Sequence, residues 1–282
     1  MKWMAAPIAV GAALALAGCT PEQQRGFLPE NSTHATNLTE GITSLWVNSW
    51  IVLLGVGVLT WGLIIWATIA YRRRKGQTGL PVQLRYNMPI ETFFTVVPVI
   101  LIIGFFAFTA QEQSKIEARY DNPENVVEVF GKRWAWDFNY LSDDVYFQGK
   151  QVETDANGSA KPETMPVLYL PVNKTTEVRL ETRDVIHSFW VVEFLYKKDM
   201  IPGQTNYMSF EPTQLGTYMG KCAELCGQYH SMMLFEVRVV EQAEYDAYVK
   251  SLRDAGNVGA VGKDFNANQD QFFGDEARAE NE

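Results

Sequence analysis

Two long stretches without a charged side chain constrain this chain most, because few folds can bury them. No Asp, Glu, Lys or Arg occurs between Glu40 and Arg72, or from Thr92 to Gln111. A helix needs about 20 predominantly apolar residues to cross a bilayer. We therefore predict two transmembrane helices, over about residues 45–70 and 89–110, since two such runs are hard to explain as buried helices of a soluble protein.

A basic cluster separates the two apolar stretches. Residues 72–75 are Arg-Arg-Arg-Lys, and Arg85 follows before the second stretch. Short loops rich in Lys and Arg remain in the cytoplasm. The loop therefore predicts a helical hairpin whose two outer ends, and everything after Gln111, face the outside of the cell.

The N-terminus has the features of an export signal. Lys2 precedes an apolar stretch from Trp3 to Ala17, and residues 16–19 are Leu-Ala-Gly-Cys. A signal peptidase requires small residues before its cleavage site, and this segment resembles a bacterial lipoprotein box. We predict a signal peptide over residues 1–18, with Cys19 as a lipidated first residue that adds one acyl anchor. The alternative is an ordinary signal peptide with an incidental cysteine.

Short segments rich in β-branched and aromatic residues follow the second helix, with Pro, Gly and Asn between them. Many short strands with such turns are typical of a β-sandwich or a Greek-key barrel, which we predict for residues 112–240. The expected strands lie at Val126–Phe130, Trp134–Phe138, Val167–Leu170, Thr176–Leu180, Ser188–Phe194, Tyr207–Phe210 and Leu234–Val240.

The remaining segments differ from the strands in composition and residue pattern. Residues 19–40 form an N-terminal segment outside the membrane, and residues 141–165 read as a long loop or a hairpin insertion. Residues 241–253 have helical spacing, and residues 254–282 are an acidic tail that we expect to be disordered or bound to a partner.

Residues 112–282 carry 29 acidic and 17 basic side chains. This excludes nucleic-acid binding and indicates either long-range attraction of a basic partner or solubility alone.

Four residues of one short stretch are potential metal ligands. Cys222, Cys226, His230 and Met233 follow one another closely, and His187 precedes them at the end of a predicted strand. Thiolates, imidazoles and a thioether together select copper. A single-copper blue site needs only one cysteine. The second cysteine therefore favours two coppers bridged by both thiolates, with one histidine on each.

Three other interpretations of this cluster compete. A disulfide is common in exported domains, but it would leave both histidines unexplained. A Cys₂His₂ zinc site would give Met233 no role. A copper carrier of thioredoxin type would show a βαβ pattern, which is not visible in this sequence.

The motifs resemble subunit II of the haem–copper cytochrome c oxidases, which carries the binuclear copper centre called CuA. The resemblance extends from about residue 40 to about residue 250. It depends most on three motifs, which are Cys-x-Glu-x-Cys-Gly-x-x-His-x-x-Met at 222–233, Asp-Val-x-His-Ser at 184–188 and Lys-x-Asp-x-x-Pro-Gly at 197–203. The resemblance implies a cupredoxin-like domain outside the membrane. Phe189, Glu193 and Gln204 depart from residues common in the family.

The resemblance also implies roles for individual residues. Cys222 and Cys226 would bridge the coppers, His187 and His230 would be terminal ligands, and Met233 a weak axial one. Glu224 would offer its backbone carbonyl to one copper and its carboxylate to a magnesium ion shared with the catalytic subunit. Its alternative is a solvated loop side chain.

Two further residues match family motifs outside the ligand loop. In the Gly-x-x-Trp-x-Trp run at 131–136, the resemblance implies that Trp134 is the residue where electrons enter. The alternative is that Trp134 and Trp136 are both core or interface aromatics, which is reasonable for Trp136. Ala135 stands where the family often has Tyr. The Glu-x-x-x-Thr-x-x-Pro run at 91–98 makes Glu91 the entrance of a proton pathway. Its alternative is a first-turn acid that favours the positive end of a helix.

The function implied is that of the electron-entry subunit of a proton-pumping oxidase in a bacterial cell membrane. It would pass single electrons from a c-type cytochrome to haem in subunit I, where oxygen is reduced to water, and would assemble with subunits I and III. The lipoprotein signal, the insertion and the acidic tail look like a Gram-positive branch whose donor can be tethered in a cytochrome bc supercomplex. The rivals are a copper-free quinol oxidase subunit, a copper carrier or assembly protein, and a metal-free anchor.

Overall fold

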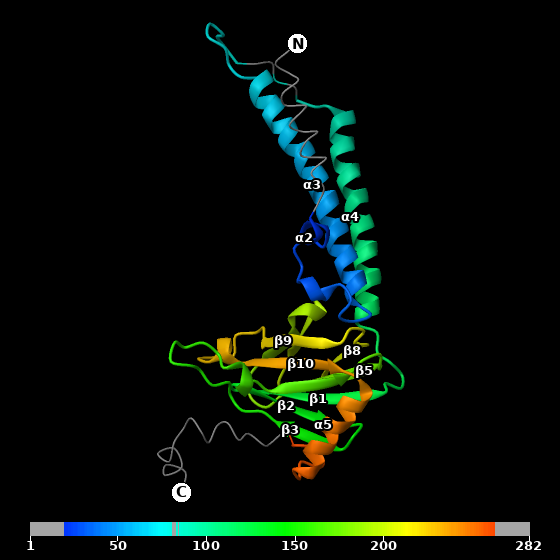
Figure 1. Cartoon of the computed structure of the whole chain (residues 1–282). Coiled ribbons are helices and arrows are strands. Elements are labelled where there is room, and N and C mark those ends of the chain that lie inside the picture. Colours follow the sequence, from blue (N-terminus) through cyan, green and yellow to red (C-terminus); the bar gives the residue numbers. More distant parts are fainter. Residues whose placement is uncertain (1–19, 81–82, 84, 263–282) are drawn as a thin grey trace. The chain divides into compact units, whose positions relative to one another are not determined.

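The computed structural model describes residues 20–80, 83 and 85–262 in two compact units (Figure 1). One unit holds two long helices, and the other holds the β-domain together with residues 29–40. The predicted signal peptide, Cys19 and residues 263–282 lie outside the described residues.

The helical unit contains a short helix α2 (Pro21–Gln24) and the two long helices α3 (Thr39–Ala70) and α4 (Met88–Ile116). In the part of the chain that the structure describes, α3 and α4 are the helices long and apolar enough to cross a membrane. Both exceed the predicted spans, because polar turns at their outer ends continue the helical hydrogen bonding. This confirms two candidate membrane helices joined by a short basic segment.

The β-domain consists of two five-stranded sheets. One has the strand order β3-β2-β1-β5-β8 and the other β4-β10-β9-β6-β7. Most neighbours are antiparallel, but β1 pairs parallel with β5, and β10 pairs parallel with β4. The strand bounds are β1 Asn125–Lys132, β2 Ala135–Tyr140, β3 Val145–Gln148, β4 Val167–Pro171, β5 Thr176–Thr182, β6 His187–Val191, β7 Lys197–Met200, β8 Asn206–Phe210, β9 Gly216–Cys222 and β10 Leu234–Val240.

Alternating side chains from the two sheets build one apolar core. Burial in β10 alternates along the strand, so that Phe235 and Val237 are fully buried while their neighbours reach the surface. Aromatic rings dominate this core. Trp136 of β2 lies 4.9 Å from Phe235, and Phe189 of β6 stacks on Phe235 at 4.8 Å, measured between ring centroids. The fold confirms the predicted all-β domain, and its two packed sheets form a sandwich.

Three strands were not predicted from the sequence. β3 falls within the 141–165 segment and pairs with β2, so the start of that segment is a hairpin. β7 and β9 also went unpredicted, because their lysines, glycines and exposed methionine obscure the alternation of a half-buried strand. The short helices are η1 Glu30–Ser32, η2 Pro162–Thr164, η3 Val192–Phe194 and η4 His230–Met232.

The C-terminal region begins as an ordered segment rather than a disordered tail. The predicted helix is α5 (Gln242–Asp254), which buries Tyr245, Val249 and Leu252. The chain then continues along the β2–β3 hairpin, where the backbone N–H and C=O of Val261 both bond to the side chain of Asn139. The prediction of disorder is therefore wrong for residues 255–262, because these backbone groups find partners in the sheet.

Residues 29–40 are also anchored to the β-domain. Thr36 forms an isolated bridge with Pro212, and the backbone N–H of Thr213 donates to the carbonyl of Ala35 over 3.1 Å. Ala35, Thr36 and Thr39 are buried. The segment before α3 is thus part of the β-domain.

Candidate metal centre

The pairing of β6 with β9 brings the distant histidine to the cysteine loop. His187 is the first residue of β6, Cys222 is the last residue of β9, and Cys222 lies opposite Phe189 in the ladder. Cys226 and His230 follow in the connection between β9 and β10, and Met233 directly precedes β10. The sheet therefore fixes His187 and Cys222, and one loop supplies the other three side chains.

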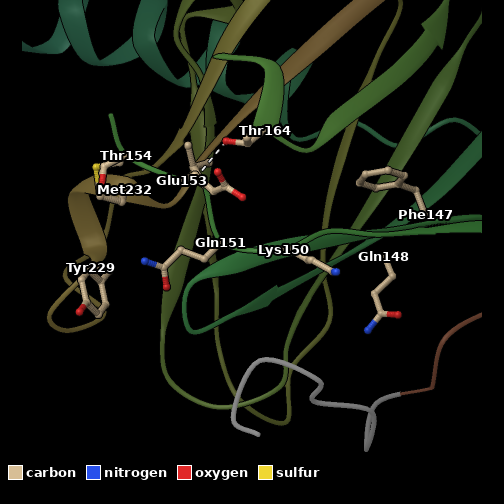
Figure 2. A pocket seen from close by; sticks show the side chains of 10 residues that line it. Phe147, Gln148, Lys150, Gln151, Glu153, Thr154, Thr164, Tyr229 and Met232 are labelled. Atoms are coloured by element: carbon tan, nitrogen blue, oxygen red, sulfur yellow. Dashed lines mark hydrogen bonds between the residues drawn. The ribbon is translucent and has the colours of Figure 1, made fainter. Parts of the chain in front are cut away.

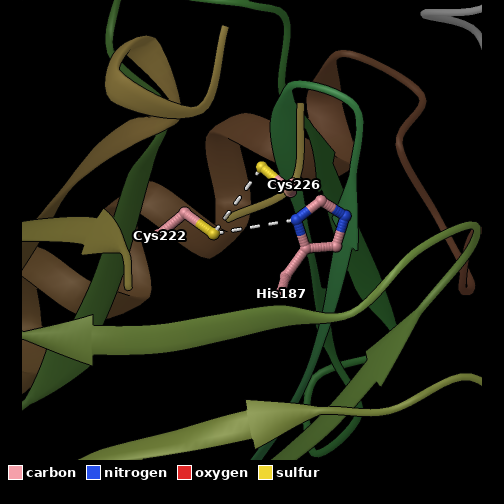
Figure 3. A group of neighbouring side chains, drawn as sticks. All are labelled: His187, Cys222 and Cys226. Atoms are coloured by element: carbon pink, nitrogen blue, oxygen red, sulfur yellow. Dashed lines mark hydrogen bonds between the residues drawn. The ribbon is translucent and has the colours of Figure 1, made fainter. Parts of the chain in front are cut away.

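The five side chains converge in a compact cluster. The sulfur of Cys222 lies 3.9 Å from the sulfur of Cys226 and 3.7 Å from Nδ1 of His187 (Figure 3). Cys226 Sγ in turn lies 3.5 Å from Nδ1 of His230 and 3.8 Å from Sδ of Met233. His187, Cys222, Cys226 and Met233 are buried. Each sulfur therefore has its own imidazole.

The two cysteines are free thiols, so the disulfide interpretation is wrong for this structure. Their sulfurs are 3.9 Å apart, whereas a disulfide bond is about 2.0 Å long. The contact between the sulfurs lowers the pKa of the Cys222 thiol and raises that of Cys226. The pair alone therefore favours one negative charge, and a bound cation would favour two thiolates.

Asp184 orients the His187 ring. Its Oδ1 lies 2.8 Å from His187 Nε2, and its Oδ2 accepts the backbone N–H of Arg133 over 2.8 Å. With Nε2 engaged, Nδ1 is the nitrogen that faces Cys222, as in metal-bound histidines held by a carboxylate. Burial alone would lower the pKa of His187, but the hydrogen bonds to Asp184 and Cys222 raise it overall. Burial opposes ionisation of Asp184, and its hydrogen bonds to His187 and Arg133 nevertheless lower its pKa.

Sequence reasoning included Asp184 in a motif but assigned it no role. The available signal was a carboxylate three positions before a ligand histidine, at a strand end where the chain can fold back. Gly131 is a second residue that belonged to a motif but was assigned no role of its own. A Cβ on Gly131 would lie 3.0 Å from Cδ2 of His187, so the glycine leaves room for the imidazole.

Glu224 presents its backbone and its side chain to different surroundings. Its carbonyl oxygen lies 3.2 Å from Cys222 Sγ, at the edge of the cluster. Its side chain is exposed. This division is compatible with a carbonyl ligand on the inner side and a carboxylate available to another chain.

The two tryptophans of β1–β2 differ in position. Trp134 is half-buried, and its Nε1 donates to the carbonyl of Cys226 over 3.3 Å. Its ring meets that of Tyr229 edge to face, with centroids 5.0 Å apart. Trp136 is completely buried in the core and donates to the carbonyl of Met233. Of these two tryptophans, Trp134 is therefore the one that joins the ligand loop to the surface.

Glu91 belongs to the helical unit and not to the metal cluster. It lies in the first turn of α4, and its carboxylate accepts the backbone N–H of Asn87 over 2.9 Å. The contact holds the carboxylate at the start of α4, which is compatible with both roles that the sequence left open.

Comparison with known proteins identifies the family to which this chain belongs. Residues 125–240 match the model described as cytochrome c oxidase subunit II, periplasmic domain. A probable cytochrome c oxidase subunit 2 of Streptomyces avermitilis is 42% identical over 257 residues, covering 81% of this chain and 80% of the relative. This chain belongs to the cytochrome c oxidase subunit II family.

A second relative agrees with this assignment. The cytochrome c oxidase subunit 2 of Mycobacterium tuberculosis strain H37Rv is 33% identical over 290 residues, covering 86% of this chain and 79% of the relative. A crystal structure of the periplasmic domain of subunit II of cytochrome oxidase from Bradyrhizobium japonicum is 29% identical, with a TM-score of 0.44. It covers 49% of this chain and 99% of that chain.

Membership of this family places the chain in an oxidoreductase complex, where it partners with the other oxidase subunits. The candidate membrane helices and the periplasmic-type domain fit a membrane protein whose C-terminal domain lies outside the cytoplasm. The side chains also fit copper by their chemistry, since buried cysteine sulfurs beside imidazole nitrogens are ligands that copper prefers.

Proposed function

We propose that this chain is the electron-entry subunit of a proton-pumping cytochrome c oxidase and holds a binuclear copper centre. The observation that supports it most directly is a pair of buried free thiols 3.9 Å apart, with one imidazole beside each sulfur. Cys222 and Cys226 would bridge the metals, His187 and His230 would be terminal ligands, and Met233 and the carbonyl of Glu224 would be weak ones. A bound copper pair would supply one-electron oxidation and reduction.

The protein around the cluster supports this role by excluding water and fixing the ligands. Trp136, Phe189 and Phe235 pack into a dry aromatic wall beside the cluster. Trp136 also holds the backbone of Met233, and Asp184 holds His187. A rigid, apolar surrounding limits how far the ligands move when the charge of the site changes, and it tunes the potential.

Trp134 is the residue we propose for electron entry. It reaches from the surface of the domain to the backbone of Cys226, one of the two bridging thiols. No other tryptophan in the described residues donates to the ligand loop from a half-buried position. The donor would be a c-type cytochrome, and the acidic domain would attract a basic one over long range.

Three further assignments complete the proposal. The exposed carboxylate of Glu224 would bind magnesium together with a neighbouring subunit. Glu91 would mark the entrance of a proton pathway at the cytoplasmic face. Cys19 would carry a lipid on the outer face of a bacterial cell membrane. Subunits I and III, and a donor tethered in a cytochrome bc complex, are the proposed partners.

A spin-resonance spectrum of the purified oxidase tests the copper centre. We expect hyperfine structure from two equivalent copper nuclei, and Cys226→Ser should replace it with the pattern of one copper. Exposed Ser231→Ala lies in the same loop and should leave the spectrum unchanged. A single-copper spectrum in the unaltered protein would exclude the binuclear centre. Absence of copper would favour the quinol-oxidase rival.

A further inference from the structure

A buried ionic network lies on the side of β2 that faces away from the aromatic core. Asp137 stands between the core residues Trp136 and Phe138, so the alternation of the strand points its carboxylate the other way. Nζ of Lys132 donates to Oδ1 of Asp137 over 2.8 Å, and Nε of Arg183 donates to Oδ2 over 3.3 Å. The side chains of Lys132, Asp137 and Arg183 are completely buried. We call these three side chains the buried network.

The buried network adjoins the residues that fix His187. Lys132 directly follows Gly131, where an added Cβ would lie 3.0 Å from Cδ2 of His187. Arg183 directly precedes Asp184, whose Oδ1 lies 2.8 Å from Nε2 of His187. The backbone N–H of Arg183 also donates to the carbonyl of Gly131 over 3.0 Å. Each buried cation is therefore one residue along the chain from a residue beside the imidazole ring.

The surroundings of the network keep water away from these charges. The guanidinium of Arg183 lies 4.1 Å from the centre of the Phe130 ring, and its Nη1 donates to the carbonyl of Gly262. Asn139 and Val261, which bond to each other on the same side of the sheet, are buried. A charge that is shielded from water acts more strongly on its neighbours and is screened less by salt.

Asp184 brings a negative charge to the site as well as a hydrogen bond. Beside His187, that charge would favour the more positive, oxidised state of a bound metal. Arg133 lies 3.4 Å from Oδ2 of Asp184, but its side chain is 37% exposed, so water and salt screen its charge. An offsetting charge that keeps its strength has to be buried.

Lys132 and Arg183 are buried cations that can supply this offset. Burial lowers the pKa values of both residues, and the negative charges of Asp137 and, more weakly, of Asp184 oppose that lowering. Asp184 is therefore within electrostatic reach of both cations. Two cations and two carboxylates leave these four groups without net charge.

We propose that Lys132 and Arg183 set the potential at which the metal centre accepts an electron, because they offset the charge of Asp184. Asp137 is a positioning residue that holds both cations beside the residues in contact with His187. This rests on the proposed function, since a redox-active metal has to occupy the cluster. The ligand histidine thus keeps a charged hydrogen-bond partner without the site becoming harder to reduce.

A redox titration of the whole solubilised oxidase tests the proposal through Lys132→Met. This variant keeps the length of the side chain, and Asp137 retains Arg183 and the backbone N–H of Gly149 as partners. A small-molecule mediator supplies one electron per metal centre, and the binuclear spin-resonance signal measures the oxidised fraction. At a fixed applied potential, the ratio of reduced to oxidised protein should fall about three- to tenfold, at low and at high salt alike. An unchanged or increased ratio would overturn the proposal.

Asp137→Asn should change the ratio in the opposite direction. The amide removes a negative charge and leaves both cations, so we expect the ratio of reduced to oxidised protein to rise. A purely structural role of the network gives no reason for opposite signs in Lys132→Met and Asp137→Asn. Shifts of the same sign in the two variants would therefore overturn the proposal.

A second pair of variants decides the question if Asp137→Asn does not fold, since it leaves two buried cations unpaired. Arg183→Met removes a charge and should lower the ratio. Arg183→Lys keeps the charge and should leave the ratio close to that of the unaltered protein. Equal shifts in these two variants would count against an electrostatic role.

An exposed ion pair on α5 provides the matched control. The side chains of Lys250 and Asp254 are 72% and 63% exposed. Lys250→Met and Asp254→Asn make the same changes of charge in contact with water, so neither should shift the ratio. A shift as large as that of Lys132→Met would show that net charge alone is responsible, and the buried network would lose its role.

The same titration separates this inference from the proposed function. If the unaltered oxidase lacks the binuclear signal, the proposed function fails, and this inference fails with it. If every folded variant shows the signal but the ratio does not respond to the buried charges, only the role of the buried network is overturned.

Discussion

Single hydrogen bonds decide which atoms of the cluster face a metal. His187 could present either ring nitrogen, but Asp184 engages Nε2 and leaves Nδ1 toward Cys222. Asp184 is in turn fixed by the backbone N–H groups of Arg133 and Val185. A carboxylate held in this way fixes both the tautomer and the orientation of the ligand.

Replacing Asp184 by Asn should weaken copper binding while retaining the fold. The amide keeps the size of the side chain but removes the negative charge that supports His187, so we expect copper affinity to fall about 10- to 100-fold. Competition with a copper chelator measures this. Asp121→Asn, at an exposed position, is the matched control. Equal copper retention in the two variants would show that the charge of Asp184 is unimportant.

Replacing Trp134 by Phe should slow electron entry and leave the copper spectrum intact. The smaller ring cannot donate to the carbonyl of Cys226, and it loses part of the contact with Tyr229. Stopped-flow reduction by the cytochrome donor should become slower, whereas Trp190→Phe, on β6, should behave as the unaltered protein. Unchanged reduction by the donor would mean that Trp134 is the wrong entry residue.

At the scale of elements, the parallel pairing of β1 with β5 places the strand that leads to Trp134 beside the strand that leads to His187. The pairing runs from Asn125 opposite Thr176 to Gly131 opposite Thr182. At its start, Glu124 accepts hydrogen bonds from Lys174 and from the backbone of Thr175. This contact closes the end of the pair that lies farthest from the cluster.

The Glu124 contact should make part of the domain's stability depend on pH. The hydrogen bond from Lys174, followed by that from Thr175, lowers the pKa of Glu124. Because the folded pKa is depressed, its contribution is present above the unfolded pKa of about 4.3 and is lost as pH falls through the folded value. Glu124→Gln should therefore lower the unfolding temperature at neutral pH, and the difference should shrink on acidification.

Thermal unfolding at several pH values measures the effect of Glu124→Gln. Glu163→Gln, at an exposed position in η2, is the control and should show no such convergence. A difference between Glu124→Gln and the unaltered protein that is constant with pH would contradict the assignment.

At the scale of the whole molecule, the order of basic loop, apolar helices and β-domain predicts which parts of the chain lie on each side of a membrane. The basic residues 72–75 lie between two helices that can each span a bilayer, and the candidate metal site lies in the domain that follows them. A donor outside the cytoplasm could then reach the cluster without crossing the membrane. The basic loop predicts this orientation because positive loops resist translocation.

Epitope tags should reveal that orientation. A tag added after Glu282 should bind antibody on intact spheroplasts, whereas a tag inserted between Lys75 and Gly76 should bind only after permeabilisation. The expected difference follows from the basic loop staying in the cytoplasm. Binding of both tags on intact cells, or the reverse pattern, would exclude the proposed topology.

The sequence predicted much of the fold, and the side chains that converge at the candidate metal site, for identifiable reasons. The apolar stretches were visible because a membrane helix needs a long run of uncharged residues, and Val126–Phe130 showed the alternation of a half-buried strand. β9 was missed because Gly216, Gly220 and Lys221 interrupt that alternation. The groove between the 141–165 segment and the side chains of Tyr229 and Met232 (Figure 2) could not be predicted either, because it depends on how that segment folds.

The sequence by itself determined two candidate membrane helices, an all-β domain and the candidate ligands, because residue type and spacing carry that information locally. Only the tertiary structure decided that His187 meets Cys222, that Asp184 turns the imidazole, and that Trp134 reaches the backbone of Cys226. His187 and Cys222 lie on different strands, Trp134 and Cys226 lie in loops far apart in the sequence, and Asp184 folds back onto His187 from the turn before β6. The distances of these contacts are set by sheet register and core packing, which no local pattern of residues specifies.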